Sequence, residues 1–318
     1  MPPAKEQLSE ITLEIEKYLE YLEVEKGSSP LTVRNYKHYL NRFSEWLKSE
    51  GIRMELKDIN PEIVRQFRLY LSRLPGYRGQ GTMSRKTQGY HAIAIRSFLR
   101  WLTKNDFEVM SADKIELPKI TERQVKFLTG EQVERLLNAP TLSNLGGKRD
   151  KAILELFYST GLRVSELCKL DRDMVNLERR EFGIVGKGGK GRVVFLSKRA
   201  ADWISGYLAE RPDHYKPLFI QHRGEPDPTT PDEKMRLSCR TIQRMIKKYA
   251  RKVKLPVDAT PHTMRHSFAT DLLMAGADIR SVQEMLGHKN IQTTQIYTHV
   301  THRHLKEIHD TFHGRGGN

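Results

Sequence analysis

Apolar side chains recur every three or four residues along most of this chain, which is the spacing of one face of an α-helix. The first such segment ends at the Gly-Ser-Ser-Pro of residues 27–30, where glycine and proline interrupt helical structure. A chain of such segments folds by burying the apolar face of each helix against its neighbours. The apolar positions of the first segment are Ile11, Ile15, Tyr18, Leu19 and Leu22.

Three more helices are expected in the first third of the chain. The second begins at Pro30, because proline suits the first helical position, and ends near Gly51. The third follows Asn60 and Pro61, where the Asn60 side chain can cap the helix. The fourth begins after Ser84, another capping residue. We expect the aromatic residues of these helices to form a core.

A polar stretch with little periodicity, residues 117–126, follows the fourth helix. Beyond it, Thr129 and Gln132 match a capping box, in which each residue caps the other at the start of a helix. We therefore predict an N-terminal helical domain at 1–116, a linker at 117–126 and a second domain at 127–318. The length of 318 residues is sufficient for two hydrophobic cores.

The second domain departs from the helical pattern at one place. Residues 182–185 and 192–196 are rich in β-forming side chains, and the glycine- and lysine-rich sequence 186–191 separates them. This arrangement predicts a β-hairpin. The predicted fold is therefore mainly α: four N-terminal helices, then a mostly helical domain with a small β-sheet formed by the hairpin.

The charge of the chain points to a polyanionic partner. It carries 54 Lys and Arg against 39 Asp and Glu, a net charge of +15. Nucleic acid is favoured, although charge alone would also suit an acidic membrane surface or ribosomal RNA. A basic chain with two lobes joined by a flexible polar linker could close around a DNA duplex.

Neither the apolar runs nor the cysteines suggest a membrane or secreted protein. No apolar run approaches the ~20 residues that span a bilayer, and the first residues lack the apolar stretch of a secretory signal. Cys168 and Cys239 form no CxxC pair and are interpreted as ordinary thiols. We expect a cytoplasmic, nucleoid-associated protein.

Three short motifs partly match known nucleotide- or metal-binding motifs, but each lacks a feature that such a site needs. Gly186, Gly188 and Gly191 satisfy the GxGxxG pattern, but a β-rich run follows where a nucleotide-binding helix should begin. Residues 309–313 have Asp where the zinc-protease motif HExxH has Glu, and 302–304 lack the hydrophobic centre of a His-hydrophobe-His metal site. No metal site is predicted.

Four other motifs carry the residue types that phosphodiester chemistry needs. Two arginines can hold the non-bridging oxygens, on which negative charge develops. A lysine can supply the proton that the departing 5′-oxygen needs, and a tyrosine can attack if cations and a proton acceptor lie nearby. The motifs are TGLRVSEL (160–167), GKGGKGR (186–192), HTMRHSFAT (262–270) and LGHKNIQTTQIYTHV (286–300).

In this order and spacing, the motifs closely resemble those of the tyrosine recombinase family, especially its Xer-type and phage or transposon integrase members. The resemblance spans nearly all of the second domain, and the N-terminal helices look like the family's SAM-like core-binding domain. It implies a site-specific DNA recombinase that works through a 3′-phosphotyrosyl intermediate, with no metal, ATP or other cofactor.

The resemblance also implies a role for individual residues. Arg163 and Arg265 match the two phosphate-binding arginines, and Glu166 matches an acidic position that supports the site. Lys187 matches the general acid of the hairpin, with Lys190 as a nearby rival.

Three further positions complete the implied catalytic set. His262 assists proton transfer, His288 hydrogen-bonds the phosphate, and Tyr297 is the nucleophile. No expected polar position is replaced, which implies an active enzyme.

The implied partner is a double-stranded DNA recombination site, held by four protomers that exchange strands through a Holliday junction. The tetramer contains either this chain alone or a second recombinase as well. Leu305, Ile308 and Phe312 recur at helical spacing in the C-terminal tail, which suits a helix packed either in its own protomer or against a neighbour. Arg240 and Arg244, four residues apart on a predicted helix, either touch DNA or lie in solvent.

Two other functions remain open from the sequence. A type IB topoisomerase would use the same residue types to relax supercoils without joining two sites. A non-catalytic DNA-binding protein would use the basic surface alone and would not need Tyr297. Whether a recombinase of this kind resolves chromosome dimers, integrates a phage or moves a transposon also stays open, as does the identity of its target DNA.

Overall fold

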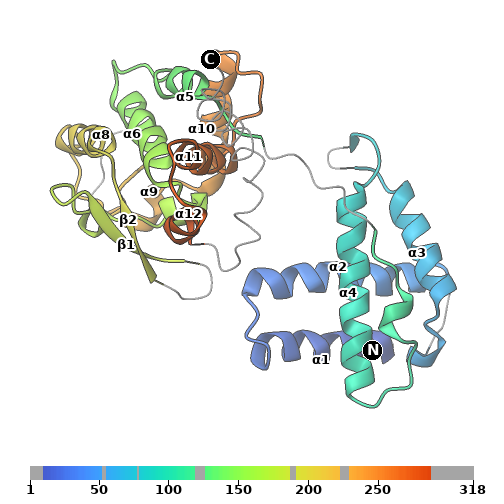
Figure 1. The fold of residues 1–318 in the computed structure, drawn as a ribbon. Helices are drawn as coiled ribbons and strands as arrows, with labels where there is room; N and C mark the ends of the chain where they lie inside the picture. Colours follow the sequence, from blue (N-terminus) through green and yellow to red (C-terminus); the bar gives the residue numbers. More distant parts are fainter. Residues whose placement is uncertain are drawn as a thin grey trace, which may run out of the picture. The chain divides into compact units, whose positions relative to one another are not determined.

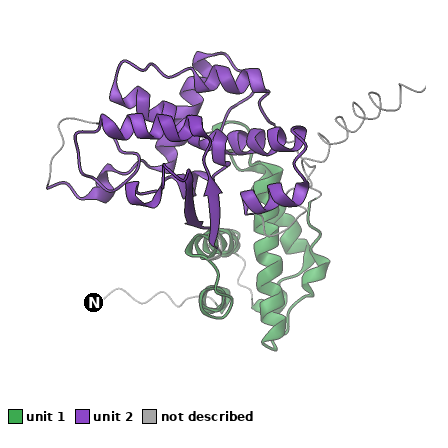
Figure 2. Cartoon of the chain, turned by 60° about the vertical axis from the view of Figure 1, so that its left-hand side comes forward, with its two compact units in different colours: residues 1–123 green, residues 124–318 purple. Residues whose placement is uncertain are grey.

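The structure, a computed structural model, describes residues 10–51, 55–76, 79–118, 126–186, 191–222 and 229–287. The chain separates into two units, residues 1–123 and 124–318 (Figure 2). The limits predicted for the linker, 117–126, stay a prediction. Within the described ranges, no helix has the length and apolar character needed to cross a membrane.

The described part of the first unit contains four α-helices, as predicted. The predicted caps are confirmed: the side chains of Ser29, Asn60 and Ser84 accept hydrogen bonds from backbone N–H groups three residues on. The helices are α1 (Glu10–Val24), α2 (Pro30–Ser49), α3 (Pro61–Arg73) and α4 (Arg85–Lys104), with short 3-10 helices at Leu56–Asp58 and Ala112–Lys114.

Helix α4 forms the centre of this unit. Helices α1 and α2 lie side by side and both pack against α4, which also contacts α3 (Figure 1). The aromatic rings fill the space between them: Tyr18, Phe43, Phe67 and Phe98 are almost completely buried. The prediction that these aromatic residues form a core is therefore confirmed.

The second unit is built around α6, ten of whose residues are buried. Helix α6 packs against α5, α8 and α11 (Figure 1). The capping box at the start of α5 is confirmed, because Thr129 and Gln132 each accept a hydrogen bond from the backbone N–H of the other. The helices are α5 (Gly130–Leu137), α6 (Leu145–Thr160), α7 (Val164–Leu167), α8 (Lys198–Ala209), α9 (Asp232–Met235), α10 (Cys239–Lys252), α11 (Pro261–Met274) and α12 (Ile279–Leu286), with a 3-10 helix at Arg172–Met174.

The predicted hairpin is also present. Strands β1 (Glu181–Val185) and β2 (Gly191–Phe195) pair antiparallel, with Ile184 opposite Arg192. Each strand begins one residue earlier than predicted, and β2 also ends one residue earlier. Because Gly191 starts a strand rather than a helix, the GxGxxG pattern is not a nucleotide-binding motif. The fold is thus mainly helical with a small two-stranded sheet, as expected.

Candidate active site

The first motif follows a sharp turn at the end of α6. Gly161 ends this helix with a left-handed backbone, φ 58°, which favours glycine. A Cβ at this position would lie 2.4 Å from Cδ1 of Phe268 on α11, well inside contact distance. Glycine therefore permits α11 to pack closely against the end of α6, and this packing brings the TGLRVSEL and HTMRHSFAT motifs together.

Arg265 is the buried cation at this junction. Its side chain leaves α11 and donates from Nη1 to the carbonyl of Gly161 at 2.7 Å and from Nη2 to the carbonyl of Leu286 at 2.6 Å. Only 4% of the residue is exposed. Both acceptors lie at helix C-termini, where carbonyl groups carry partial negative charge. The guanidinium therefore connects the ends of α6 and α12.

Arg163 reaches the same turn from the start of α7. It donates from Nη1 to Oε1 of Glu166 at 2.7 Å and from Nη2 to the carbonyl of Gly287 at 3.2 Å. Its side chain is 27% exposed. Since Gly287 follows Leu286, the two arginines bind consecutive carbonyl groups. The structure thus places both predicted phosphate-binding arginines at one turn.

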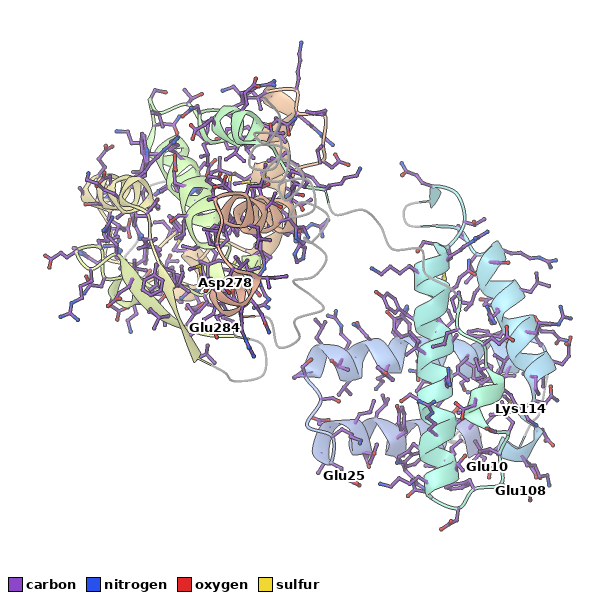
Figure 3. The ribbon with its side chains drawn as sticks, in the orientation of Figure 1. Glu10, Glu25, Glu108, Lys114, Asp278 and Glu284 are labelled. Carbon is purple, nitrogen blue, oxygen red and sulfur yellow. The ribbon has the colours of Figure 1, made fainter. Side chains whose placement is uncertain are left out.

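The helix that supplies this turn is anchored at both ends. The Asp278 carboxylate caps α12 by accepting from the backbone N–H groups of Arg280 and Ser281, each at 2.9 Å. Figure 3 labels Asp278, which precedes this helix, and Glu284, which lies within it. Gly287 ends it with φ 65°. The position of the two carbonyl acceptors is therefore set by a short, capped helix.

Glu166, which was predicted to support the site, accepts hydrogen bonds from two arginines. Its carboxylate accepts from Nη1 and Nη2 of Arg192 at 3.0 and 2.9 Å, and from the backbone N–H of Arg163 at 2.9 Å, besides the Arg163 side chain. Burial raises the pKa of Glu166. The hydrogen bonds from Arg192 and Arg163 lower it by more than burial raises it, so that the pKa is about 2. The group is a carboxylate at neutral pH.

Arg192 is the residue that sequence reasoning missed. It is the last residue of the GKGGKGR motif and lies on β2, but its partner Glu166 lies 26 residues away in the chain. An arginine at the start of a predicted strand was the available signal. The contact itself depends on how the hairpin packs against α7.

The two histidines of α11 lie in different environments. His262 is exposed in the first turn of the helix, whereas Arg265 three residues on is buried. His266 is half-buried, and burial together with the nearby His262 and Arg265 lowers its pKa to about 4. His266 is therefore neutral near pH 7, while His262 is exposed on the surface of its unit.

The structure does not test the assignment of several other predicted residues. Lys187, Lys190, His288 and Tyr297 lie outside the described residues. Arg240 and Arg244 are exposed on α10, and the opposite face of this helix packs into the core. Their assignment to DNA stays a prediction.

Comparison with known proteins identifies the family of this chain. The Phage integrase family model matches residues 126–304, and the model of the phage integrase N-terminal SAM-like domain matches residues 15–106. The chain is 37% identical over 309 residues to the tyrosine recombinase XerC of Thermodesulfovibrio yellowstonii, covering 94% of this chain and 95% of the relative. It is 38% identical over 309 residues to the tyrosine recombinase XerA of Thermococcus kodakarensis, covering 95% and 96%.

The fold is shared with a solved recombinase. The crystal structure of the XerH site-specific recombinase bound to a palindromic difH substrate, a post-cleavage complex, aligns with a TM-score of 0.67. The alignment covers 93% of this chain and 83% of that one, at 22% identity, and so concerns the fold. With both domain models and the close relatives in agreement, this chain belongs to the phage integrase family and is a tyrosine recombinase.

Proposed function

We propose that this protein is a site-specific DNA recombinase that cleaves and rejoins strands through a covalent bond between Tyr297 and a DNA phosphate. The observation that carries the proposal is the convergence of Arg163 and Arg265 on consecutive carbonyl groups, directly before the segment that contains His288 and Tyr297. Two guanidinium groups at one turn suit a phosphate that gains charge during attack.

The first step is a transesterification. The Tyr297 hydroxyl oxygen attacks the scissile phosphorus, and the bond from phosphorus to the 5′-oxygen breaks. His262 assists removal of the tyrosine proton, and Lys187 protonates the departing 5′-oxygen. Arg163 and Arg265 stabilise the charge on the non-bridging oxygens, together with His288.

The second step reverses the first on a different strand. The 5′-hydroxyl of the partner strand attacks the 3′-phosphotyrosyl bond, and Tyr297 leaves and regains its proton. One phosphodiester forms for each that is broken, so the pair of steps needs no ATP. The chain's own cations carry out the charge stabilisation that metal ions provide in other phosphoryl-transfer sites.

The test is covalent capture on a nicked suicide duplex. The duplex carries a site that the wild-type protein enriches from fragments of its source genome. Wild type and Tyr297→Phe are incubated with it in EDTA. We expect a covalent protein–DNA band with wild type alone. A band from both proteins would exclude Tyr297, and no band from either, despite tight binding, would exclude catalysis by this chain alone on that site.

Two further assays separate recombination from topoisomerase activity. Relaxation of any supercoiled plasmid, irrespective of sequence, would favour a type IB topoisomerase. Formation of joined products only between two copies of the selected site would favour recombination.

We further propose that four protomers hold the double-stranded DNA sites and exchange their strands through a Holliday junction. The four protomers are copies of this chain alone or include a second recombinase. A head-to-tail contact made by the C-terminal tail would close such a ring. Removal of the residues after Val300 should then weaken pairing of two sites in native gels while leaving single-site binding nearly unchanged. Unchanged pairing would reject a role of the tail in assembly.

A further inference from the structure

Glu166 lies between two guanidinium groups that bind it differently. Arg192 uses both terminal nitrogens, at 3.0 and 2.9 Å, whereas the Arg163 side chain makes one hydrogen bond to the carboxylate, at 2.7 Å. The side chains of Glu166 and Arg192 are 7% and 10% exposed, against 27% for Arg163. The buried pair is therefore Glu166 with Arg192, and Arg163 is the more accessible of the two cations.

This arrangement decides how much positive charge Arg163 offers to a ligand. One carboxylate between two guanidinium groups leaves a net charge of +1 on the cluster. A bidentate pair is the strongest geometry between arginine and carboxylate, and here Arg192 occupies it. Without Arg192, the same carboxylate could pair fully with Arg163 and neutralise the cation that faces solvent.

Arg192 also touches the turn at the end of α12. A Cβ built on Gly287 would lie 2.9 Å from Nη1 and 3.0 Å from Cδ of Arg192, so the arginine packs directly over this glycine. The same residue lies at the start of β2, opposite Ile184 and just after the hairpin turn that contains Lys187. One side chain thus connects the hairpin to α7 and to the α12 turn.

We propose that Arg192 is a positioning residue for strand cleavage: by holding Glu166, it keeps Arg163 available to the scissile phosphate and fixes the hairpin against the α12 turn. This inference rests on the proposed function. It differs from a plain structural ion pair, which would affect stability without changing the charge that Arg163 presents.

The test is a double-mutant cycle on the nicked suicide duplex. Wild type, Arg192→Gln, Glu166→Gln and the double variant are compared. At saturating protein, the rate of covalent-complex formation is measured separately from the DNA dissociation constant and the melting temperature. The control is Arg199→Gln, which breaks another arginine bridge in the same unit, to Glu134 and Glu155, neither of which hydrogen-bonds Arg163, Arg192 or Arg265.

We expect Arg192→Gln to slow cleavage about 10- to 100-fold, the scale of a misplaced catalytic group, with a much smaller change in DNA binding. The double variant should cleave faster than Arg192→Gln, because the carboxylate that would capture Arg163 is absent. Arg199→Gln should cleave at the wild-type rate. Rescue by the second substitution is the readout that a structural pair alone would not produce.

Wild-type cleavage by Arg192→Gln, or a double variant no faster than it, would overturn this inference alone. If Arg192→Gln does not fold, the cleavage rates of Glu166→Gln and the double variant are compared instead. Equal rates would support the inference that Arg192 acts through Glu166. A double variant slower than Glu166→Gln would overturn that inference. Absence of a covalent complex with wild type would overturn the proposed function and this inference with it.

Discussion

The carbonyl oxygen of Gly161 accepts a hydrogen bond from Nη1 of Arg265 at 2.7 Å, although 104 residues separate them in the chain. The same guanidinium binds the carbonyl of Leu286 at 2.6 Å. One buried cation therefore holds the ends of α6 and α12 against α11. Because Arg163 binds the next carbonyl, that of Gly287, the geometry of the proposed phosphate site depends on this connection.

Replacement of Arg265 should destabilise the protein as well as inactivate it. Arg265→Gln leaves two buried carbonyl groups without their donor, and each costs about 1–3 kcal/mol. We expect the free energy of unfolding in urea to fall by roughly 2–6 kcal/mol. Arg163→Gln is the matched control, because its side chain is 27% exposed: it should lose cleavage with a smaller loss of stability. Equal destabilisation by both would contradict this view of Arg265.

Glu166 should make stability depend on pH in the acid range. Its folded-state pKa of about 2 lies below the ordinary 4.5, so the carboxylate stabilises the fold above pH 4.5. That contribution, roughly 3 kcal/mol, is lost as pH falls from 4.5 through 2. The free energies of unfolding of wild type and Glu166→Gln should therefore converge over this interval. If the difference in free energy of unfolding between wild type and Glu166→Gln stays constant down to pH 2, Glu166 does not cause the loss of stability in acid.

Gly161 should tolerate no side chain. Gly161→Ala combines a left-handed backbone, φ 58°, with a Cβ 2.4 Å from Cδ1 of Phe268. Strain and overpacking together should lower the free energy of unfolding by about 2–5 kcal/mol. Cleavage should also fall, since the displaced carbonyl is a partner of Arg265. The control is Gly183→Ala on β1, where a Cβ meets nothing within 4 Å. Similar melting temperatures for the two variants would refute the close contact.

Gly287 allows a comparison of backbone strain with side-chain contact. Gly287→Ala and Gly276→Ala both place alanine at a positive φ, 65° and 93°, which costs about 1–2 kcal/mol each. At Gly287 the new methyl group also meets Arg192, whereas at Gly276 it meets nothing within 4 Å. We expect cleavage of the suicide duplex to fall at least about 10-fold in Gly287→Ala and to persist in Gly276→Ala. Equal cleavage rates would argue against a role of the Arg192 contact.

The local features of the fold could be read from the sequence. Helix starts at Ser29, Asn60 and Ser84, and the capping box at Thr129, depend on hydrogen bonds between residues three apart. The hairpin likewise depends on neighbouring residues and a glycine-rich turn. Interactions of such short range are determined by residue type and spacing, and the motif order that identifies the family is a property of the sequence itself.

The contacts that assemble the site were decided by tertiary structure. Nothing in the spacing indicates that Glu166 pairs with Arg192, because this depends on how β2 packs against α7. Nor does the three-residue spacing of His262 and Arg265 indicate that one is exposed and the other buried between helix ends. Residue types thus determined which groups can do the chemistry. Long-range packing determined which of them meet, because such a contact depends on every element that holds the two segments in place.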